Sequence, residues 1–281
     1  MSGELTDYQQ ENSQKPDREK ARFEFNWQPL TLALAVVLAC YVSGHGDDLI
    51  YYLLYLPIVV LIHELGHVVA GRLFGCEIER LQVFFVPFIT YRPHDGGEWS
   101  WWRVITWRLG VLPLGGYTLF WSRDEWEIFA AESEDEELTR YLEEVDSASS
   151  PFIGDKPAWQ RLIISLGGVL FNFITFAALY AAYSLMPAWT WAGLEGDIAL
   201  NVMLLSLLLG VLNLFPIYPL DGGAILYQIY EMVTGRKPSD EFSTWTFWIG
   251  GIIILLLFWV MPIIIPNFMS QFYDWIFNLF F

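Results

Sequence analysis

Apolar residues gather in five long runs along the chain, separated by polar or turn-forming stretches. The runs cover approximately residues 27–44, 50–75, 160–186, 198–220 and 243–265. A hydrocarbon layer of ~30 Å is crossed by about 20 helical residues, and each run is near that length. The pattern therefore predicts a polytopic α-helical membrane protein with about five transmembrane helices.

Composition and charge agree with this prediction. Of the 281 residues, 54% are hydrophobic and 17% aromatic, more than a soluble domain of this size covers easily with polar surface. The net charge of −17 argues against a nucleic-acid partner, because phosphate binding needs excess Lys and Arg. In the topology below, Cys40 and Cys76 fall near opposite membrane faces, so we expect free thiols.

The basic residues predict the orientation in the membrane. Four precede the first run, nine lie between the second and third runs or at their facing ends, and two lie between the fourth and fifth, which accounts for all 15. Cytoplasmic loops carry the excess of Lys and Arg, so the N-terminus is expected in the cytoplasm. Residues 1–26 then form a polar cytoplasmic tail without signal-peptide character, and 27–44 an extra N-terminal transmembrane helix.

The stretch 76–121 has the pattern of β-structure. Aromatic and β-branched residues flank a turn at Asp95-Gly96, which is a hairpin signal. Because these strands are unusually apolar for a cytoplasmic segment, we expect a membrane-re-entrant β-hairpin region on the cytoplasmic side. Residues 50–121 thus comprise the second transmembrane helix plus these strands.

Residues 122–155 are acidic, with twelve Asp and Glu between Asp124 and Asp155. Interspersed apolar residues predict one or two amphipathic helices. The favoured interpretation is a solubilising cytoplasmic loop, and a gate over an active site or a partner-docking segment are the alternatives.

The second run contains His63-Glu64-Leu65-Gly66-His67. Residues at i and i+4 share a helix face, so both imidazoles can bind one metal ion, with Glu64 placed to take a proton from water. Ionisable groups inside an apolar span are costly and mark function. The structural alternative is that the histidines only form hydrogen bonds between helices.

A catalytic zinc needs a third protein ligand, for which Asp221 is the best candidate. Pro216 and Pro219 interrupt the fourth run just before it, and Gly222-Gly223 allow a sharp turn behind it. At 1.5 Å per residue, Asp221 reaches about the depth of His63. The alternative is that Asp221 is only a helix N-cap.

Four motifs in this order resemble the site-2 protease family of intramembrane zinc metalloproteases, in its minimal form without PDZ domains. They are His63–His67, Pro113–Tyr117, Ser165–Phe173 with Asn172, and Asn213 followed by Leu220-Asp221-Gly222. The resemblance covers approximately residues 50–235, and Val169 departs from it where the family usually has Pro.

The resemblance implies a site with Zn²⁺ as cofactor. The implied ligands are His63, His67 and Asp221, and Glu64 is the implied catalytic general base. Asn172 and Asn213 would lie near the bound substrate, although either could instead be an interhelical hydrogen-bonding residue. Residues 160–235 form the core helices of this site, and 243–281 the last transmembrane helix with an interfacial tail.

The implied function is hydrolysis of peptide bonds within or near the transmembrane segment of membrane-anchored proteins, as in regulated intramembrane proteolysis. The implied location is a bacterial or archaeal cell membrane, as a multi-pass protein in contact with the lipid bilayer. One alternative is a catalytically silent zinc-binding scaffold that holds single-span clients, and another is a transporter with histidines on an ion path. The sequence leaves the substrate, any prior cleavage and the oligomeric state open.

Overall fold

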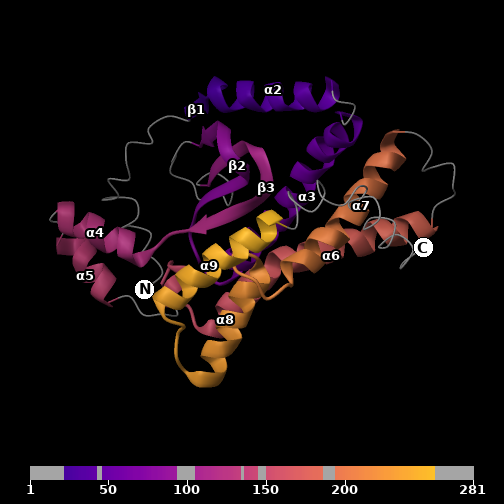
Figure 1. The fold of residues 1–281 in the computed structure, drawn as a ribbon. Helices are drawn as coiled ribbons and strands as arrows, with labels where there is room; N and C mark the ends of the chain where they lie inside the picture. The colour runs from indigo at the N-terminus through magenta and orange to yellow at the C-terminus, as the bar shows by residue number, and fades with distance from the viewer. Residues whose placement is uncertain are drawn as a thin grey trace. The chain divides into compact units, whose positions relative to one another are not determined.

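Two long apolar helices, α3 (Gly46–Leu73) and α6 (Ala158–Leu185), carry residues of the predicted site (Figure 1). His63, Glu64 and His67 lie on α3, and Asn172 lies on α6. The computed structural model describes residues 22–42, 46–93, 105–133, 136–144, 150–185 and 194–256. Within these residues, only Leu54–Leu73 and Ala158–Leu185 are long and apolar enough to cross a membrane. The five-helix topology therefore remains a prediction.

The other three runs are shorter or incompletely described. The helix α2 (Trp27–Val42) has 16 residues, and the apolar part of α7 (Leu194–Asn213) begins at Ile198. The run expected to reach residue 220 stops at Asn213, because Pro216 lacks the N–H that a helix requires. The helix α9 (Asp240–Leu255) begins the last run, and the expected tail at 267–281 lies outside the described residues.

The chain divides into two units, and α3 contributes to both. The first unit comprises residues 1–64 and 71–155, and the second comprises residues 65–70 and 156–281. In the second unit, α6 packs against α7 and against α8 (Asp221–Thr234).

A three-stranded sheet forms the centre of the first unit, in the order β1 (Arg22–Phe25), β2 (Ile78–Arg92), β3 (Thr106–Phe120). The structure thus has antiparallel β2 and β3 where a hairpin was expected. The Asp-Gly turn itself and residues up to 104 lie outside the described part of the chain.

The antiparallel pairing of β2 with β3 extends along both strands and is interrupted by several register shifts. The first half of β2 lies opposite the end of β3, with Val83 beside Gly116 and Leu81 beside Thr118. The second half lies opposite the start of β3, with Tyr91 beside Trp107. Phe84 and Val86 bend β2 between these halves with positive φ angles of 64° and 57°, which a β-branched residue such as Val rarely adopts.

The strand β1 differs from the solvated tail that was expected up to residue 26. Arg22–Phe25 pair with Ile89–Arg92 of β2, and Glu24 forms an ion pair of 2.5 Å with Arg92. All four side chains of β1 are exposed. Backbone pairing with a strand distant in sequence therefore orders the end of this segment.

The acidic segment contains two helices, α4 (Arg123–Ser133) and α5 (Glu136–Glu144), followed by a 3₁₀ turn at Ile153–Asp155. Arg123 holds them on this turn, because its Nε donates to Asp155 Oδ2 at 2.8 Å and its guanidinium donates to the Leu142 carbonyl. Leu142 and Phe152 form a small apolar cluster with Trp121 and Trp126. Amphipathic helices are thus present where they were predicted.

Candidate active site

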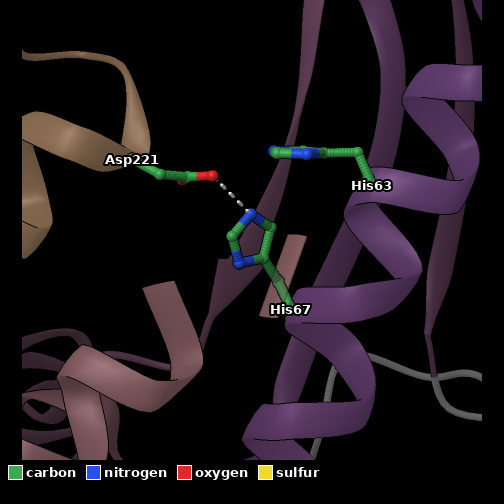
Figure 2. A group of neighbouring side chains, drawn as sticks. All are labelled: His63, His67 and Asp221. Atoms are coloured by element: carbon green, nitrogen blue, oxygen red, sulfur yellow. Dashed lines mark ion pairs between the residues drawn. The ribbon is translucent and has the colours of Figure 1, made fainter. Parts of the chain in front are cut away.

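The helix α3 brings His63, Glu64 and His67 into the protein interior. All three side chains are buried, with relative exposures of 5%, 4% and 8%. Because His63 and His67 are one helical turn apart, they project from the same face of α3 (Figure 2).

Asp221 meets this face from the second motif. Its Oδ2 lies 3.3 Å from Nε2 of His67, and the two side chains point toward each other in Figure 2. One potential ligand atom from each of His63, His67 and Asp221 lies within 4.8 Å of the others. The structure therefore brings together the three residues expected to bind the metal.

The start of α8 explains how Asp221 is presented. Leu220 is the N-cap and Asp221 is the first helical residue, so the alternative that Asp221 merely caps the helix is wrong. Gly222 and Gly223 are buried against the preceding turn, where an added Cβ would overlap the Leu214 carbonyl and the Tyr218 backbone. The two glycines thus let the chain before the helix fold tightly against its first turn.

The donor set fits zinc. Catalytic zinc sites take three protein ligands from His, Asp or Glu and leave one position open. Two ligands of a tetrahedral zinc, each at ~2.0–2.1 Å, are about 3.4 Å apart, and the separation of 3.3 Å between His67 and Asp221 matches this value.

The orientation of His67 is set by α6. Its Nδ1 lies 2.8 Å from the main-chain oxygen of Ile164, so this nitrogen carries the proton and Nε2 is the nitrogen directed at Asp221. This is an interhelical hydrogen bond, as the structural alternative expected, but it uses only one ring nitrogen. A backbone partner of this kind fixes the tautomer of metal-binding histidines.

Close packing of glycines makes this hydrogen bond possible. An added Cβ on Gly167 would lie 2.5 Å from the Gly66 oxygen, and one on Gly66 would overlap the Gly167 carbonyl. The backbones of α3 and α6 are therefore nearly in contact beside His67.

Two polar contacts hold α8 on α6. Arg161 forms an ion pair of 2.6 Å with Glu231, and Gln228 donates to Ser165 at 3.0 Å. Since Asp221 begins α8, these contacts also restrain the position of its carboxylate.

The two asparagines are buried, Asn172 on α6 and Asn213 at the end of α7. The Asn213 amide donates to the Leu209 carbonyl of its own helix at 3.0 Å. Their expected position near a substrate stays a prediction.

Two contributors to the site were not predicted from the sequence. The Ile164 carbonyl is a main-chain group that no side-chain motif could reveal. Thr118, whose hydroxyl donates to Glu64 Oε2 at 2.8 Å, directly follows the predicted motif Pro113–Tyr117, and this position was the available signal.

Comparison with known proteins agrees with these motifs. The model for peptidase family M50 matches residues 51–192 and 191–257. The metalloprotease MmpA of Caulobacter vibrioides is 33% identical over 153 residues, which is 52% of this chain and 36% of that protein. A Thermotoga maritima protein named as a zinc metalloprotease is 31% identical over 137 residues, which is 49% of this chain and 23% of that protein.

The chain therefore spans only about a third or less of the length of these two relatives. Among solved structures, the site-2 protease from Methanocaldococcus jannaschii is similar with a TM-score of 0.47 and 19% identity, over 90% of this chain and 91% of that one. The relatives' names agree with zinc as the expected cofactor. Because the family model covers most of the sequence, the chain belongs to peptidase family M50, the site-2 protease family that its motifs predicted.

Proposed function

We propose that this chain is an intramembrane zinc metalloprotease that cleaves membrane-anchored proteins within or near their transmembrane segments. The contact of 3.3 Å between His67 and Asp221 is the observation that supports this most directly. It joins two motifs, far apart in sequence, into a set of two imidazoles and one carboxylate. Membership of peptidase family M50 supports the same activity.

In the proposed reaction, Glu64 is the general base. It removes a proton from the attacking water and later donates it to the leaving amine. Zinc, held by His63, His67 and Asp221, would act as a Lewis acid on the scissile carbonyl and make water a better nucleophile near neutral pH. Burial of Glu64 and the histidines strengthens every electrostatic interaction among them.

The sheet is the proposed site for the substrate backbone. A transmembrane helix must unwind before cleavage, and an unwound segment in an apolar medium needs backbone partners. Addition of the segment to a sheet edge supplies them. The pairing of β1 with β2, made with four exposed side chains, supports the idea that this sheet accepts a short extended segment. Asn172 and Asn213 are proposed to lie near the bound segment.

We further propose that five helices cross the membrane, with the N-terminus and the acidic segment in the cytoplasm and the sheet re-entrant from the cytoplasmic side. The distribution of all 15 basic residues supports this orientation. Exposed apolar side chains on α6, such as Leu170 and Ile174, suit contact with lipid. On this proposal, the acidic segment is a solubilising loop.

The test compares the membrane proteomes of cells that carry the wild-type protein, the Glu64→Gln variant or the Glu143→Gln variant. Glu143 is an exposed residue of α5, so its variant is a matched control for the same chemical change. We expect membrane-anchored stubs to accumulate only in the Glu64→Gln cells and to co-purify with that variant.

The opposite result would be equal proteomes in all three strains. If the Glu64→Gln protein then still held about one zinc per chain, the silent scaffold would be the better account. The absence of zinc from the wild-type protein would contradict both.

A further inference from the structure

We propose that Thr118 is a positioning residue that holds the Glu64 carboxylate in the orientation needed for proton transfer. This inference rests on the proposed role of Glu64 as general base. Thr118 lies in β3 and Glu64 in α3, both within the first unit of the fold.

The Thr118 hydroxyl lies close to two acceptors on Glu64. Its Oγ1 is 2.8 Å from the carboxylate oxygen Oε2 and 3.2 Å from the main-chain oxygen. A hydroxyl has one proton, and the shorter contact leads to a charged acceptor, so the carboxylate receives the bond. Hydrogen bonds to ionised groups are about twice as strong as neutral ones, which gives this bond the strength to fix a rotamer.

The strand is shaped to let the carboxylate approach. Gly116 lies two residues before Thr118, and a Cβ added there would lie 3.0 Å from Glu64 Oε1 and 2.8 Å from Val60 Cγ1. Any other residue at 116 would crowd the carboxylate from the strand side. The Oε1 oxygen of Glu64 thus lies next to Gly116, and the Oε2 oxygen accepts the hydrogen bond from Thr118.

Further contacts hold this part of β3 in place. The Tyr117 hydroxyl donates to Gln82 Oε1 at 2.9 Å, and Gln82 Nε2 donates to the Phe84 carbonyl at 2.9 Å. Gln82 is buried, so the network ties β3 to the bend of β2. A hydroxyl carried by a strand restrained in this way can orient a carboxylate more tightly than one carried by a mobile loop.

Loss of the Thr118 hydroxyl should affect the rate of cleavage rather than the binding of substrate. A general base must lie within hydrogen-bonding reach of the proton that it removes, and proton transfer of this kind contributes typically 10²- to 10⁴-fold. The hydrogen bond from Thr118 limits the rotamers of Glu64, and so limits the orientations from which its carboxylate can take a proton. Loss of the hydroxyl should lower kcat, because Glu64 then samples unproductive rotamers.

The test uses three variants of the full-length protein purified in detergent. Thr118→Val keeps the β-branched shape and removes the hydroxyl, whereas Thr118→Ser keeps the hydroxyl. Thr90→Val makes the same change at a buried threonine of β2 and is the matched control. Zinc per chain and the thermal transition are measured on every sample.

Two readouts are taken. The first is the infrared carboxylate band of Glu64, identified from the difference between wild type and Glu64→Gln. We expect Thr118→Val to shift this band, and Thr118→Ser and Thr90→Val to leave it unchanged.

The second readout is cleavage of a stub recovered from Glu64→Gln cells. We expect Thr118→Val to lower kcat by about 10- to 100-fold and to change KM less than about twofold. Thr118→Ser should restore most of the rate.

The outcomes separate this inference from the proposed function. An unchanged infrared band in Thr118→Val, or a rate equal to wild type, would overturn the role of Thr118 while Glu64→Gln still abolishes cleavage. A shifted band together with cleavage that persists in Glu64→Gln would instead overturn the role of Glu64 as general base.

Discussion

Substitution of Gly167 by Ala should loosen the proposed metal site without changing any of its three proposed ligands. In wild type, a Cβ built on Gly167 would lie 2.5 Å from the Gly66 oxygen, 2.9 Å from the Gly66 carbonyl carbon and 3.0 Å from Ala70 Cβ. Two of these neighbours are main-chain atoms of α3, so no side chain can move aside to make room.

The required shift can be worked out from these distances. Ordinary contacts between carbon and its neighbours begin at about 3.5 Å, so the helices must separate by about 1 Å. The hydrogen bond of 2.8 Å between His67 Nδ1 and the Ile164 oxygen would then lengthen to about 3.8 Å, which is no longer a hydrogen bond. Overpacking of this kind costs about 1–3 kcal/mol of stability.

The expected result is weaker zinc binding. Loss of the partner that orients a metal-binding histidine typically lowers metal affinity by about 10- to 100-fold. The assay is competition with a chelating dye, performed on purified wild type, Gly167→Ala and Gly251→Ala. Gly251 lies in helix α9, and among the described residues outside its own stretch of helix no atom lies within 4 Å of an added Cβ, so it is the matched control and should bind zinc as wild type does.

Zinc binding by Gly167→Ala as tight as that by Gly251→Ala, together with an equal unfolding temperature, would contradict this prediction. That result would mean that α3 and α6 are not held against each other at Gly66, or that the Ile164 carbonyl has no part in orienting His67.

Two further predictions concern Asp221 and the helix that it begins. Asp221→Ala should abolish stoichiometric zinc binding, measured by metal analysis, because two histidines alone leave the site one ligand short; retention of one zinc per chain would exclude Asp221 as a ligand. Arg161→Gln should lower the free energy of unfolding by about 1–3 kcal/mol, because Glu231 then keeps a largely buried charge without its cation. Thermal unfolding should show the double variant Arg161→Gln/Glu231→Gln to be more stable than the single one, and a less stable double variant would contradict this.

The grouping of the candidate metal ligands could be predicted from the sequence because helix geometry is local. The spacing of His63 and His67 fixes a shared face, and Pro216 and the glycines after Asp221 mark the break at which the carboxylate is presented. The helix α7 ends at Asn213, three residues before Pro216, so the expected interruption of the fourth run begins slightly earlier than the proline itself.

The sheet was harder to predict because its pairing is not local. The apolar and aromatic pattern indicated two strands, but nothing in it showed that Phe84 and Val86 would adopt positive φ angles and bend β2. Phe and Val favour extended strands, so tertiary contacts here override local preference. Strand β1 was missed for the same reason, since its partner on β2 is more than sixty residues away.

The contacts that orient the proposed catalytic groups also could not be predicted from the sequence. The Ile164 carbonyl reaches His67 only because two glycines from different helices meet, and Thr118 reaches Glu64 only because β3 runs beside α3. Each depends on distances between elements, which patterns of residue type do not contain.

Cleavage by the purified protein in lipid, with zinc measured on the same samples, tests the proposed mechanism most directly. Wild type and Glu64→Gln are compared on a stub recovered from the Glu64→Gln cells. We predict about one zinc per chain in both proteins and cleavage by wild type alone. Equal cleavage by both proteins, or cleavage by wild type that contains no zinc, would contradict the proposal that Glu64 acts at a zinc site formed by His63, His67 and Asp221.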